Sequence, residues 1–293
     1  MVAALDAATQ AIGLSDPNPR VGCVLIGADG QTLGLGHTQA AGGPHAEIMA
    51  LRDAQSRGHS TVGATAYVTL EPCSHHGKTG PCCDALIAAG IRRVVASVTD
   101  PNPQVTGQGF ERLRAAGIAV EVGMGADESR TLNIGFFSRM VRKIPWVRMK
   151  VAASLDGKTA LNNGVSQWIT SDEARTDGHA WRARSSAVLT GVGTILQDHP
   201  RLDVRLVPTV RQPAVVITDS HLRTPVDAPS LIANRIVYIY AAAQNDAREV
   251  ALKSRGATIH QLPGTDGKVD LAAMLRDLTR VLPTIAQHCS WPA

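Results

Sequence analysis

Two short stretches in the first 90 residues combine side chains that bind soft metals with a carboxylate. GGPHAEIMAL (42–51) places His45 two residues before Glu47, and TLEPCSHHGKTGPCCDAL (69–86) supplies Cys73 and Cys82. Three protein ligands leave the fourth position of a tetrahedral zinc ion open to water, which is typical of catalytic zinc. Because such zinc lowers the pKa of its water to about 7, the sequence predicts zinc held by His45, Cys73 and Cys82, with Glu47 as proton carrier.

Both stretches also have the features of a helix start. Pro44 and Pro81 stand immediately before His45 and Cys82, at a position where helices tolerate proline. The partial positive charge of a helix N-terminus favours a thiolate, so we expect Cys82 to ionise readily.

Several neighbouring side chains compete with this ligand set. His75, His76 and Cys83 are also within reach along the sequence. Cys83 follows Cys82 on the expected helix and points about 100° away, so we expect it to pack against a sheet. Cys23 lies in an apolar strand and is interpreted as a core residue. The order of His, Glu and two Pro-Cys pairs follows the zinc-deaminase pattern, although eight residues separate the cysteines here.

The residues around these motifs alternate between helical and strand patterns, which predicts a layered α/β domain over residues 1–142. Another helix is expected to start near His45. The remaining helices are expected at 2–13, 82–90, 109–117 and 126–141, and strands at 20–27, 32–36, 65–70, 92–98 and 118–123.

A second α/β domain is expected over residues 146–293. The segment RKIP (142–145) is interpreted as a linker, because Pro145 disfavours helix at the residue before it. Strands are expected at 146–154, 187–191, 214–219, 235–240 and 258–262, and helices at 171–184, 245–255 and 270–280.

The bulk properties narrow the class of protein. The net charge of +4 is spread without a block of like charges, which argues against a nucleic-acid partner and suits an anionic small molecule. No run of about 18 apolar residues occurs, so no membrane span is expected. The five cysteines and the lack of a signal peptide favour a reducing cytoplasm, where cysteines bind metals or take part in catalysis.

Several stretches of the sequence resemble a known family. DPNPRVG (16–22), PHAE (44–47), TLEPCSHHGKTGPCCDALIAAG (69–90) and DPNPQVTGQG (100–109) resemble the RibD family of riboflavin biosynthesis. The resemblance covers nearly all of residues 1–282. It implies a cytidine-deaminase-like three-layer domain, which deaminates a phosphorylated pyrimidine, followed by a dihydrofolate-reductase-like α/β domain, which reduces the product with NADPH.

The resemblance also implies roles in the first half. The substrate would be 2,5-diamino-6-(5-phosphoribosylamino)pyrimidin-4(3H)-one, with zinc bound as predicted above and Glu47 as the catalytic proton shuttle. Asn18, His75 and Lys78 occupy family positions that contact substrate, and Lys78 could meet the phosphate as a point charge. One departure stands out, because a family histidine is replaced here by Thr38, with His37 one position earlier.

For the second half, the resemblance rests on KVAASLDGKTA (150–160), SQWITS (166–171), WRARSSAVLTGVGTILQDHPRLDVR (181–205) and VVITDS (215–220). The resemblance implies that Asp198 donates a proton and also lies at the cofactor. His199, which follows it in an unusual Asp-His-Pro sequence, is given no role. The implied substrate residues are Lys150, Ser166, Arg182, Leu202 and Arg205, and the implied NADPH residues are Ala152, Trp168, Thr194, Asp198 and Ser220.

The last residues depart from the family. Where the family continues into a strand and a glycine-containing loop at the cofactor, this chain reads PTIAQHCSWPA (283–293). We therefore expect a truncated second domain that lacks sheet strands, exposes an apolar edge and has weak reductase activity. Since the family's dimers form through this domain, the expected truncation also weighs against a homodimer.

Three alternatives remain open from the sequence. The protein could be a zinc nucleoside or tRNA deaminase with an appended domain, or a deaminase with a non-functional reductase remnant. It could also be a non-catalytic binding module stabilised by a closed zinc site. A fourth protein ligand, such as Cys83 or a neighbouring histidine, would favour the last of these.

Overall fold

The computed structural model describes residues 1–293 except 76–79, 104, 167, 232–234, 283–285 and 291–293. The chain forms two compact units, Met1–Arg142 and Lys143–Ala293. Within the described ranges, no helix is both long and apolar enough to cross a membrane.

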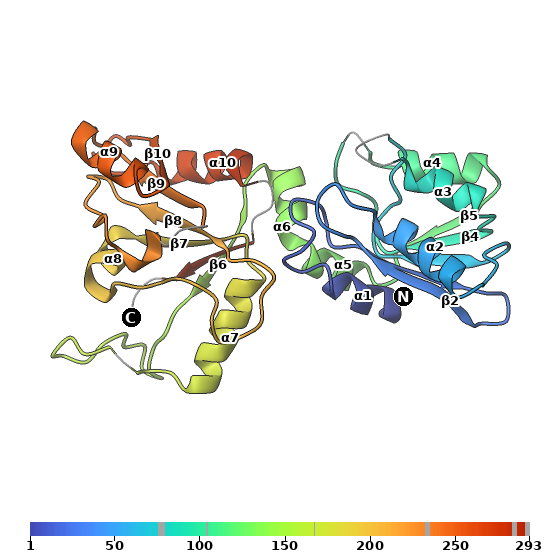
Figure 1. Ribbon diagram of the computed structural model, residues 1–293, viewed down its shortest axis with the longest axis horizontal. Coiled ribbons are helices and arrows are strands. Elements are labelled where there is room, and N and C mark those ends of the chain that lie inside the picture. Colours follow the sequence, from blue (N-terminus) through green and yellow to red (C-terminus); the bar gives the residue numbers. More distant parts are fainter. Residues whose placement is uncertain (76–79, 104, 167, 232–234, 283–285, 291–293) are drawn as a thin grey trace. The chain divides into compact units, whose positions relative to one another are not determined.

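The first unit is a five-stranded sheet with helices on both faces (Figure 1). The strands β1 (Gly22–Ile26), β2 (Thr32–His37), β3 (Thr65–Val68), β4 (Arg93–Ala96) and β5 (Ala119–Val122) lie in the order β2-β1-β3-β4-β5. β1 is antiparallel to β2 and β3, whereas β3, β4 and β5 are parallel. One face carries α1 (Val2–Thr9) and α5 (Ala126–Leu132), and the other carries α2 (Ala46–Ser56), α3 (Cys82–Ala88) and α4 (Gln108–Ala115).

Small residues allow α2 to lie directly on the sheet. Ala46, Ala50 and Ala54 are fully buried and recur every four residues, so they form one stripe along the helix. They face Gly34 and Gly36 of β2, where an added Cβ would come within 2.2 Å of the Ala50 carbonyl oxygen and 2.4 Å of the Ala46 carbonyl oxygen, respectively. This contact fixes the start of α2, and therefore the position of His45 and Glu47.

Replacing Gly36 with Ala should move this helix start. The new methyl group would overlap the backbone of α2, and such overpacking costs about 1–3 kcal/mol. We expect a lower denaturant midpoint for the first unit together with a lower zinc content. Thr32→Ala, at the exposed start of the same strand, is the control and should change neither quantity. Unchanged metal content in Gly36→Ala would show that the helix start does not depend on this contact.

The closing helix of the first unit is broken where the sequence predicted one continuous helix over 126–141. α5 ends at Leu132, and it is followed by α6 (Ile134–Phe137) and a π-helical turn (Ser138–Arg142). The break falls at Asn133, whose side-chain amide exchanges two hydrogen bonds with the backbone of Arg20, at 2.8 and 2.9 Å. A tertiary contact, which the helical pattern does not encode, sets the interruption.

The second unit is a six-stranded sheet in the order β10-β9-β8-β7-β11-β6. Its strands are β6 (Trp146–Lys150), β7 (Ala187–Gly191), β8 (Ala214–Thr218), β9 (Val237–Ala241), β10 (Ala257–Gln261) and β11 (Ala286–Ser290), and every neighbouring pair is parallel. The helices are α7 (Asp172–Ala183), α8 (Val192–Asp198), α9 (Asp246–Lys253) and α10 (Leu271–Val281), with a 3-10 turn at Pro229–Leu231.

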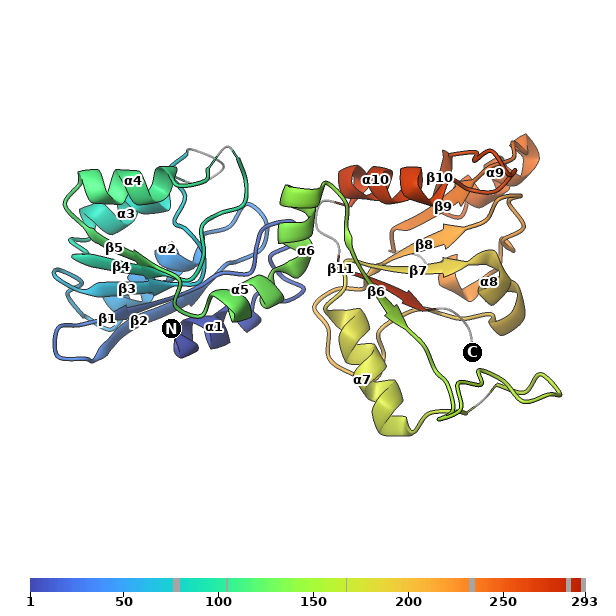
Figure 2. The same ribbon diagram turned by 180° about the vertical axis from the view of Figure 1, so that it is seen from behind.

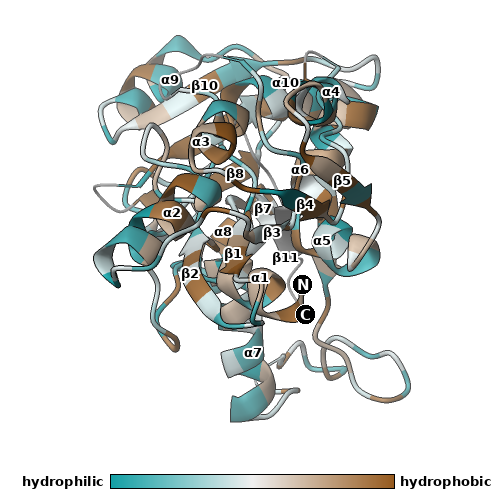
Figure 3. Cartoon of the chain, turned by 90° about the vertical axis from the view of Figure 1, so that its right-hand side faces the viewer, coloured by the Kyte–Doolittle hydropathy of each residue, from teal (hydrophilic) through white to brown (hydrophobic). Residues whose placement is uncertain are grey.

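Alternate residues of β8 divide the core of this unit into two layers. Val215 and Ile217 pack in the cluster that contains Ile195 of α8 and Leu252 of α9, whereas Val216 packs in the cluster of α10. Strands buried on both faces have near-continuous apolar sequences, and β8 is brown in Figure 3 whereas α7 is largely teal. Helices on both faces of a parallel sheet define an α/β domain.

Two elements of the second unit differ from the sequence expectation. In the segment GVGTIL, in which no helix was predicted, β7 ends at Gly191 and the following residues form the first part of α8. The expectation that the last residues contribute no strand was wrong, since β11 lies between β7 and β6 and pairs with both (Figure 2). The space between these two strands is therefore filled.

Candidate active site

A cavity of about 460 Å³ opens in the first unit above the N-terminus of α2. Its lining includes the predicted metal and proton-shuttle residues His45, Cys73 and Glu47. Other walls come from residues that are distant in the sequence. They include Pro17, Asn18, Pro19, Thr38, Gly42, Gly43, His75, Asp100, Asn102, Phe136, Arg139 and Met140.

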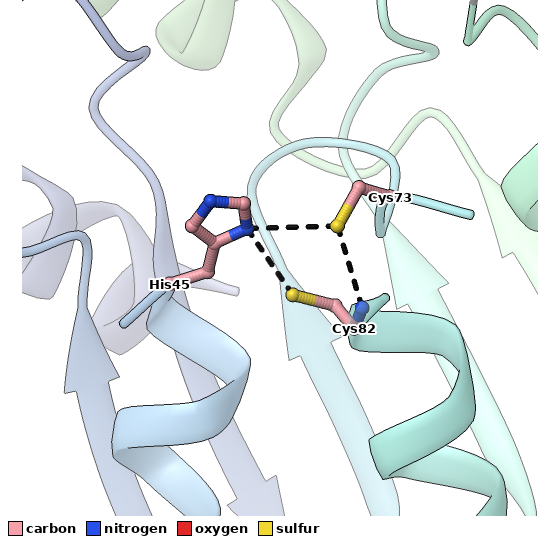
Figure 4. Close-up of side chains that lie close together, drawn as sticks. All are labelled: His45, Cys73 and Cys82. Carbon is pink, nitrogen blue, oxygen red and sulfur yellow. Dashed lines mark hydrogen bonds between the residues drawn. The ribbon is translucent and has the colours of Figure 1, made fainter. Parts of the chain in front are cut away.

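Three side chains converge beside this cavity (Figure 4). His45 is the N-cap residue of α2, Cys82 begins α3, and Cys73 lies in the loop between β3 and α3. The Nδ1 atom of His45 lies 3.6 Å from the Cys73 sulfur and 3.3 Å from the Cys82 sulfur. The backbone N–H of Cys82 donates to the Cys73 sulfur at 3.3 Å. The three ligand atoms all lie within 4.8 Å of one another.

This arrangement has the dimensions of a zinc site. Tetrahedral zinc, with bonds of about 2.3 Å to sulfur and 2.0–2.1 Å to nitrogen, places its nitrogen and sulfur ligands about 3.5 Å apart. The two measured nitrogen–sulfur distances, 3.6 and 3.3 Å, lie on either side of that value. Two sulfurs and one imidazole nitrogen are also ligands that zinc prefers. The residues present therefore fit a zinc ion with one position open toward the cavity.

The titration of the cysteines agrees with this grouping. Hydrogen bonding from Cys82, with a further bond from His45, lowers the pKa of Cys73 to about 4. The same Cys73–Cys82 pairing raises the pKa of Cys82. Since metal binding requires thiolates, zinc would displace the proton of Cys82. The neighbouring Cys83 differs, because burial raises its pKa to about 12.

Cys83 and Cys23 lie in the core, as the sequence predicted. Both are fully buried in the cluster beneath the sheet, and the Cys83 sulfur donates to the carbonyl oxygens of Pro72 and Gly109, at 3.2 and 3.5 Å. Among the described residues, Cys83 is therefore not part of the metal-binding group.

Glu47 lies in the first turn of α2, and its side chain is buried at the cavity wall. Burial raises the pKa of Glu47 to about 7, the negative charge of Cys73 adds to this effect, and His45 opposes it. A carboxyl group with a pKa near neutrality can both accept and deliver a proton at that pH. Glu47 therefore has the protonation behaviour that a proton shuttle requires.

The implied substrate residues of the first unit are partly in place. Asn18 and His75 line the cavity, whereas Lys78 lies outside the described residues. Thr38 is also at the cavity wall, and its hydroxyl exchanges hydrogen bonds with the backbone of Val21, at 3.2 and 3.4 Å. His37 is not among the lining residues, so it does not take the place of Thr38 at the wall.

Sequence reasoning assigned no role to four polar lining residues, Asp100, Asn102, Arg139 and Glu71. A signal for the first two was present, because the tetrapeptide Asp-Pro-Asn-Pro occurs at 16–19 and again at 100–103. Residues of both copies line this cavity. Burial raises the pKa of Asp100 to about 6. Arg139 belongs to the π-helical turn, and no sequence pattern indicated that this turn would form a wall.

A second group of implied residues converges in the second unit. Lys150 ends β6, Arg182 lies on α7, and Leu202 and Arg205 belong to the loop after α8. Burial lowers the pKa of Lys150 and of Arg182, and nearby positive charge adds to both effects, from Arg182 and Arg205 respectively. Asp203 is the carboxylate that pairs with Arg205, at 2.7 Å. This excess of positive charge suits a phosphate group.

The remaining implied residues of the second unit are more dispersed. Ser166, Ala152 and Trp168 belong to the exposed segment between β6 and α7, and the Arg175 guanidinium stacks on Trp168 with 4.3 Å to the ring centre. Thr194 and Asp198 lie on α8, and Ser220 follows β8. The described contacts do not join Ser166 to the basic group.

Comparison with known proteins decides the family. Residues 1–98 match the cytidine and deoxycytidylate deaminase zinc-binding region, and residues 145–285 match the RibD C-terminal domain. The chain is 45% identical over 289 residues to the riboflavin biosynthesis protein RibD of Escherichia coli, covering 95% of this chain and 77% of that protein. The chain belongs to the RibD family.

Solved RibD structures have the same fold over almost the whole chain. The Acinetobacter baumannii RibD structure (form 1) matches with a TM-score of 0.86 at 38% identity, covering 98% of this chain and 78% of that one. The Thermotoga maritima deaminase/reductase also matches with a TM-score of 0.86, at 35% identity, covering 99% and 79%. The predicted fold class, a cytidine-deaminase-like domain followed by a dihydrofolate-reductase-like domain, is confirmed.

Membership of the RibD family also confirms the general function and the cofactors. RibD is a bifunctional enzyme of riboflavin biosynthesis, with a zinc-binding deaminase domain and an NADPH-using reductase domain, and both domain types are present here. The His45, Cys73 and Cys82 group is compatible with the zinc. The protein therefore acts on a small molecule.

The carboxyl edge of the second sheet has features that fit a dinucleotide. Ligands of parallel sheets bind outside the carboxyl ends of the strands. There the buried Thr190 hydroxyl has no described hydrogen-bond partner, and a Cβ added at Gly193 would meet nothing within 4 Å. Thr194 lies beside this open backbone. The Ser220 hydroxyl, in contrast, accepts a hydrogen bond from the Val269 backbone N–H at 3.2 Å.

His179 is expected to make the stability of the second unit depend on pH. Its Nδ1 accepts the Arg205 backbone N–H at 3.2 Å, and burial, with Arg182 and Arg205 nearby, lowers its pKa to about 4. Between that value and the ordinary histidine pKa of about 6.5, the unfolded chain binds more protons than the folded one. The free energy of unfolding should therefore fall as pH is lowered from about 6.5 to 4.

Thermal unfolding of the chain at several pH values measures this effect. His179→Gln keeps an acceptor for the Arg205 N–H but does not titrate, so the decline should become shallower. His221, for which the structure gives no comparable backbone bond, provides the control, and His221→Gln should leave the decline unchanged. Equal slopes in the unchanged chain and in His179→Gln would contradict the assignment.

Proposed function

We propose that the first unit deaminates 2,5-diamino-6-(5-phosphoribosylamino)pyrimidin-4(3H)-one. The observation that supports this most directly is the convergence of His45, Cys73 and Cys82 on one side of a cavity that Glu47 also lines. The solved Thermotoga maritima relative is described as a diaminohydroxyphosphoribosylaminopyrimidine deaminase and 5-amino-6-(5-phosphoribosylamino)uracil reductase.

The residues of the cavity divide the work of deamination. His45, Cys73 and Cys82 would hold zinc, which when bound supplies activated water near neutral pH. Glu47 would take one proton from the attacking water and deliver it to the pyrimidine ring nitrogen. It would then take the second proton from the added hydroxyl group and deliver it to the amine, so that ammonia leaves as the carbonyl forms. Asn18 and His75 would orient the pyrimidine, and the Lys78 side chain, proposed from the sequence, would meet the phosphate. Burial of Glu47 excludes solvent from the proton transfer.

We propose that the second unit, residues 146–293, reduces the ribosyl group of the deaminated product to ribityl. NADPH, when bound, supplies the hydride. Lys150, Arg182 and Arg205 would bind the phosphate, and Leu202 and Ser166 would contact the sugar and the ring. Asp198, whose pKa burial raises, would deliver the proton. Ala152, Trp168, Thr194 and Ser220 would contact NADPH.

The direct test is substrate turnover by the zinc-loaded chain. We expect ammonia release from the diaminopyrimidine phosphate and none from cytidine, and chelation should abolish it. Turnover of cytidine without turnover of the phosphorylated pyrimidine would instead indicate a nucleoside deaminase. Loss of NADPH absorbance on addition of the deaminated product tests the second unit, and no loss would indicate a deaminase with an inactive reductase remnant.

We also propose the class of partner, the cellular location and the oligomeric state of the enzyme. The diffuse net charge of +4 supports a small anionic substrate without a nucleic-acid partner. Cys23, Cys73, Cys82 and Cys83 are unpaired thiols, which supports a cytoplasmic location. A homodimer through the second unit stays a prediction, to be checked by light scattering.

A further inference from the structure

The loop that carries Leu202 and Arg205 has a strained backbone. His199 and Leu202 have φ values of +43° and +55°, in the left-handed region that side chains other than glycine rarely adopt. Such residues persist only where surrounding contacts hold them. Since this loop supplies two of the proposed substrate contacts, the residues that hold it should matter for binding.

Arg235, outside the proposed binding residues, contacts this loop from behind. Its guanidinium donates to three backbone carbonyls, those of Pro213 at 2.9 Å, Arg201 at 2.7 Å and Leu202. The Pro213 carbonyl immediately precedes β8, so Arg235 joins the loop to the rigid sheet. A planar guanidinium can make all three bonds at once, whereas an ammonium on a flexible chain cannot reproduce that geometry.

Gln212 holds the next part of the loop. Its side-chain oxygen accepts the Val204 N–H at 2.7 Å, and its side-chain nitrogen donates to the Val204 carbonyl at 2.9 Å. This pair of bonds fixes the peptide groups on both sides of Val204, as a neighbouring strand would. Gln212 also lies next to β8, so the loop is anchored to the sheet at two points.

The anchored loop is joined in turn to the basic group. Arg182 donates to the Asp203 carbonyl at 3.3 Å, and the Arg205 N–H donates to His179. The Asp203 carboxylate pairs with the side chains of Arg201 and Arg205, each at 2.7 Å. A displacement of the loop would therefore change the spacing between Arg182 and Arg205.

We infer that Arg235 and Gln212 are positioning residues for the substrate phosphate, because they hold loop 201–205 so that Arg205 and Arg182 face one anion. This inference rests on the proposed reductase function of the second unit. Arg235 itself does not bind the phosphate, since its guanidinium is occupied by three carbonyls. Its contribution is geometric, because it would hold the loop that sets the spacing of Arg205 and Arg182.

The test compares two ligands by calorimetry, 5-amino-6-(5-phosphoribosylamino)uracil and its dephosphorylated form, with no NADPH present. The dissociation constant of the dephosphorylated ligand divided by that of the phosphorylated ligand measures the affinity that the phosphate contributes. We expect Arg235→Lys and Gln212→Ala each to lower this ratio about tenfold, with the dephosphorylated ligand bound as before. A general loss of stability would weaken the binding of both ligands equally and leave the ratio unchanged.

Two further variants complete the design. Arg248→Ala is the matched control, because Arg248 also donates to two carbonyls, of Leu222 and Thr224, beside a residue with φ of +54°. It should leave the ratio unchanged. Arg182→Ala tests the proposed site itself, and an unchanged ratio in this variant would contradict the proposed phosphate site of the second unit. If Arg182→Ala lowers the ratio but Arg235→Lys and Gln212→Ala do not, the positioning inference alone is overturned.

Discussion

Glu47→Gln is expected to lower the deamination rate by about 10²–10⁴-fold while zinc remains bound. The glutamine has the same shape as Glu47 and fits the same buried position, but it cannot carry a proton between water and substrate. Glu47 is not one of the three converging ligand residues, so its replacement leaves them intact. Ammonia release and metal analysis by mass spectrometry on the same sample measure the two quantities.

The matched control is Glu111→Gln, which removes a carboxylate from the exposed face of α4 in the same unit. It should leave both rate and metal content unchanged. Full activity in Glu47→Gln would remove the proton-shuttle assignment. Loss of zinc together with activity would instead make Glu47 a ligand, a result that the geometry of the site does not favour.

The sequence predicted the parts of the fold that depend on local pattern. β7 was predicted at 187–191 and lies at Ala187–Gly191, and α7 was predicted at 171–184 and lies at Asp172–Ala183. In both, the spacing of apolar residues and the flanking turn residues are sufficient. The break at Asn133 was missed because it depends on a contact with Arg20, more than 100 residues away. α8 was missed because its first turn, with Gly193, reads as a loop.

The sequence predicted the metal-binding part of the candidate site, where a motif and the chemistry of its side chains indicate the same residues. His45, Cys73 and Cys82 could be grouped from the sequence, because two proline-marked helix starts present His45 and Cys82, and Cys73 supplies a second thiol in the same motif as Cys82. The opposite wall could not be predicted, since Arg139 reaches the cavity only through the fold of the closing helix. In the second unit, Arg235 and Gln212 act through the backbone, and no side-chain motif marks such residues.

Cys82→Ser and Cys83→Ser form a pair that separates metal binding from packing. The hydroxyl of serine does not ionise near neutral pH and is a poor zinc ligand, so Cys82→Ser should weaken zinc binding more than about 100-fold and abolish deamination. Cys83→Ser retains a donor for the Pro72 and Gly109 carbonyls, so it should keep both zinc and activity. Competition with a chromogenic chelator measures the zinc affinity of each variant.

The pair also tests the rival arrangement of a closed zinc site. Adjacent cysteines at the start of α3 differ in direction, with Cys82 facing His45 and Cys83 facing the core. Only Cys82 groups with the sulfur of Cys73, whose pKa is lowered to about 4. If zinc were lost from Cys83→Ser as well, four protein ligands would surround the metal. That result would leave no position for water, and the first unit would be a structural zinc domain without deaminase activity.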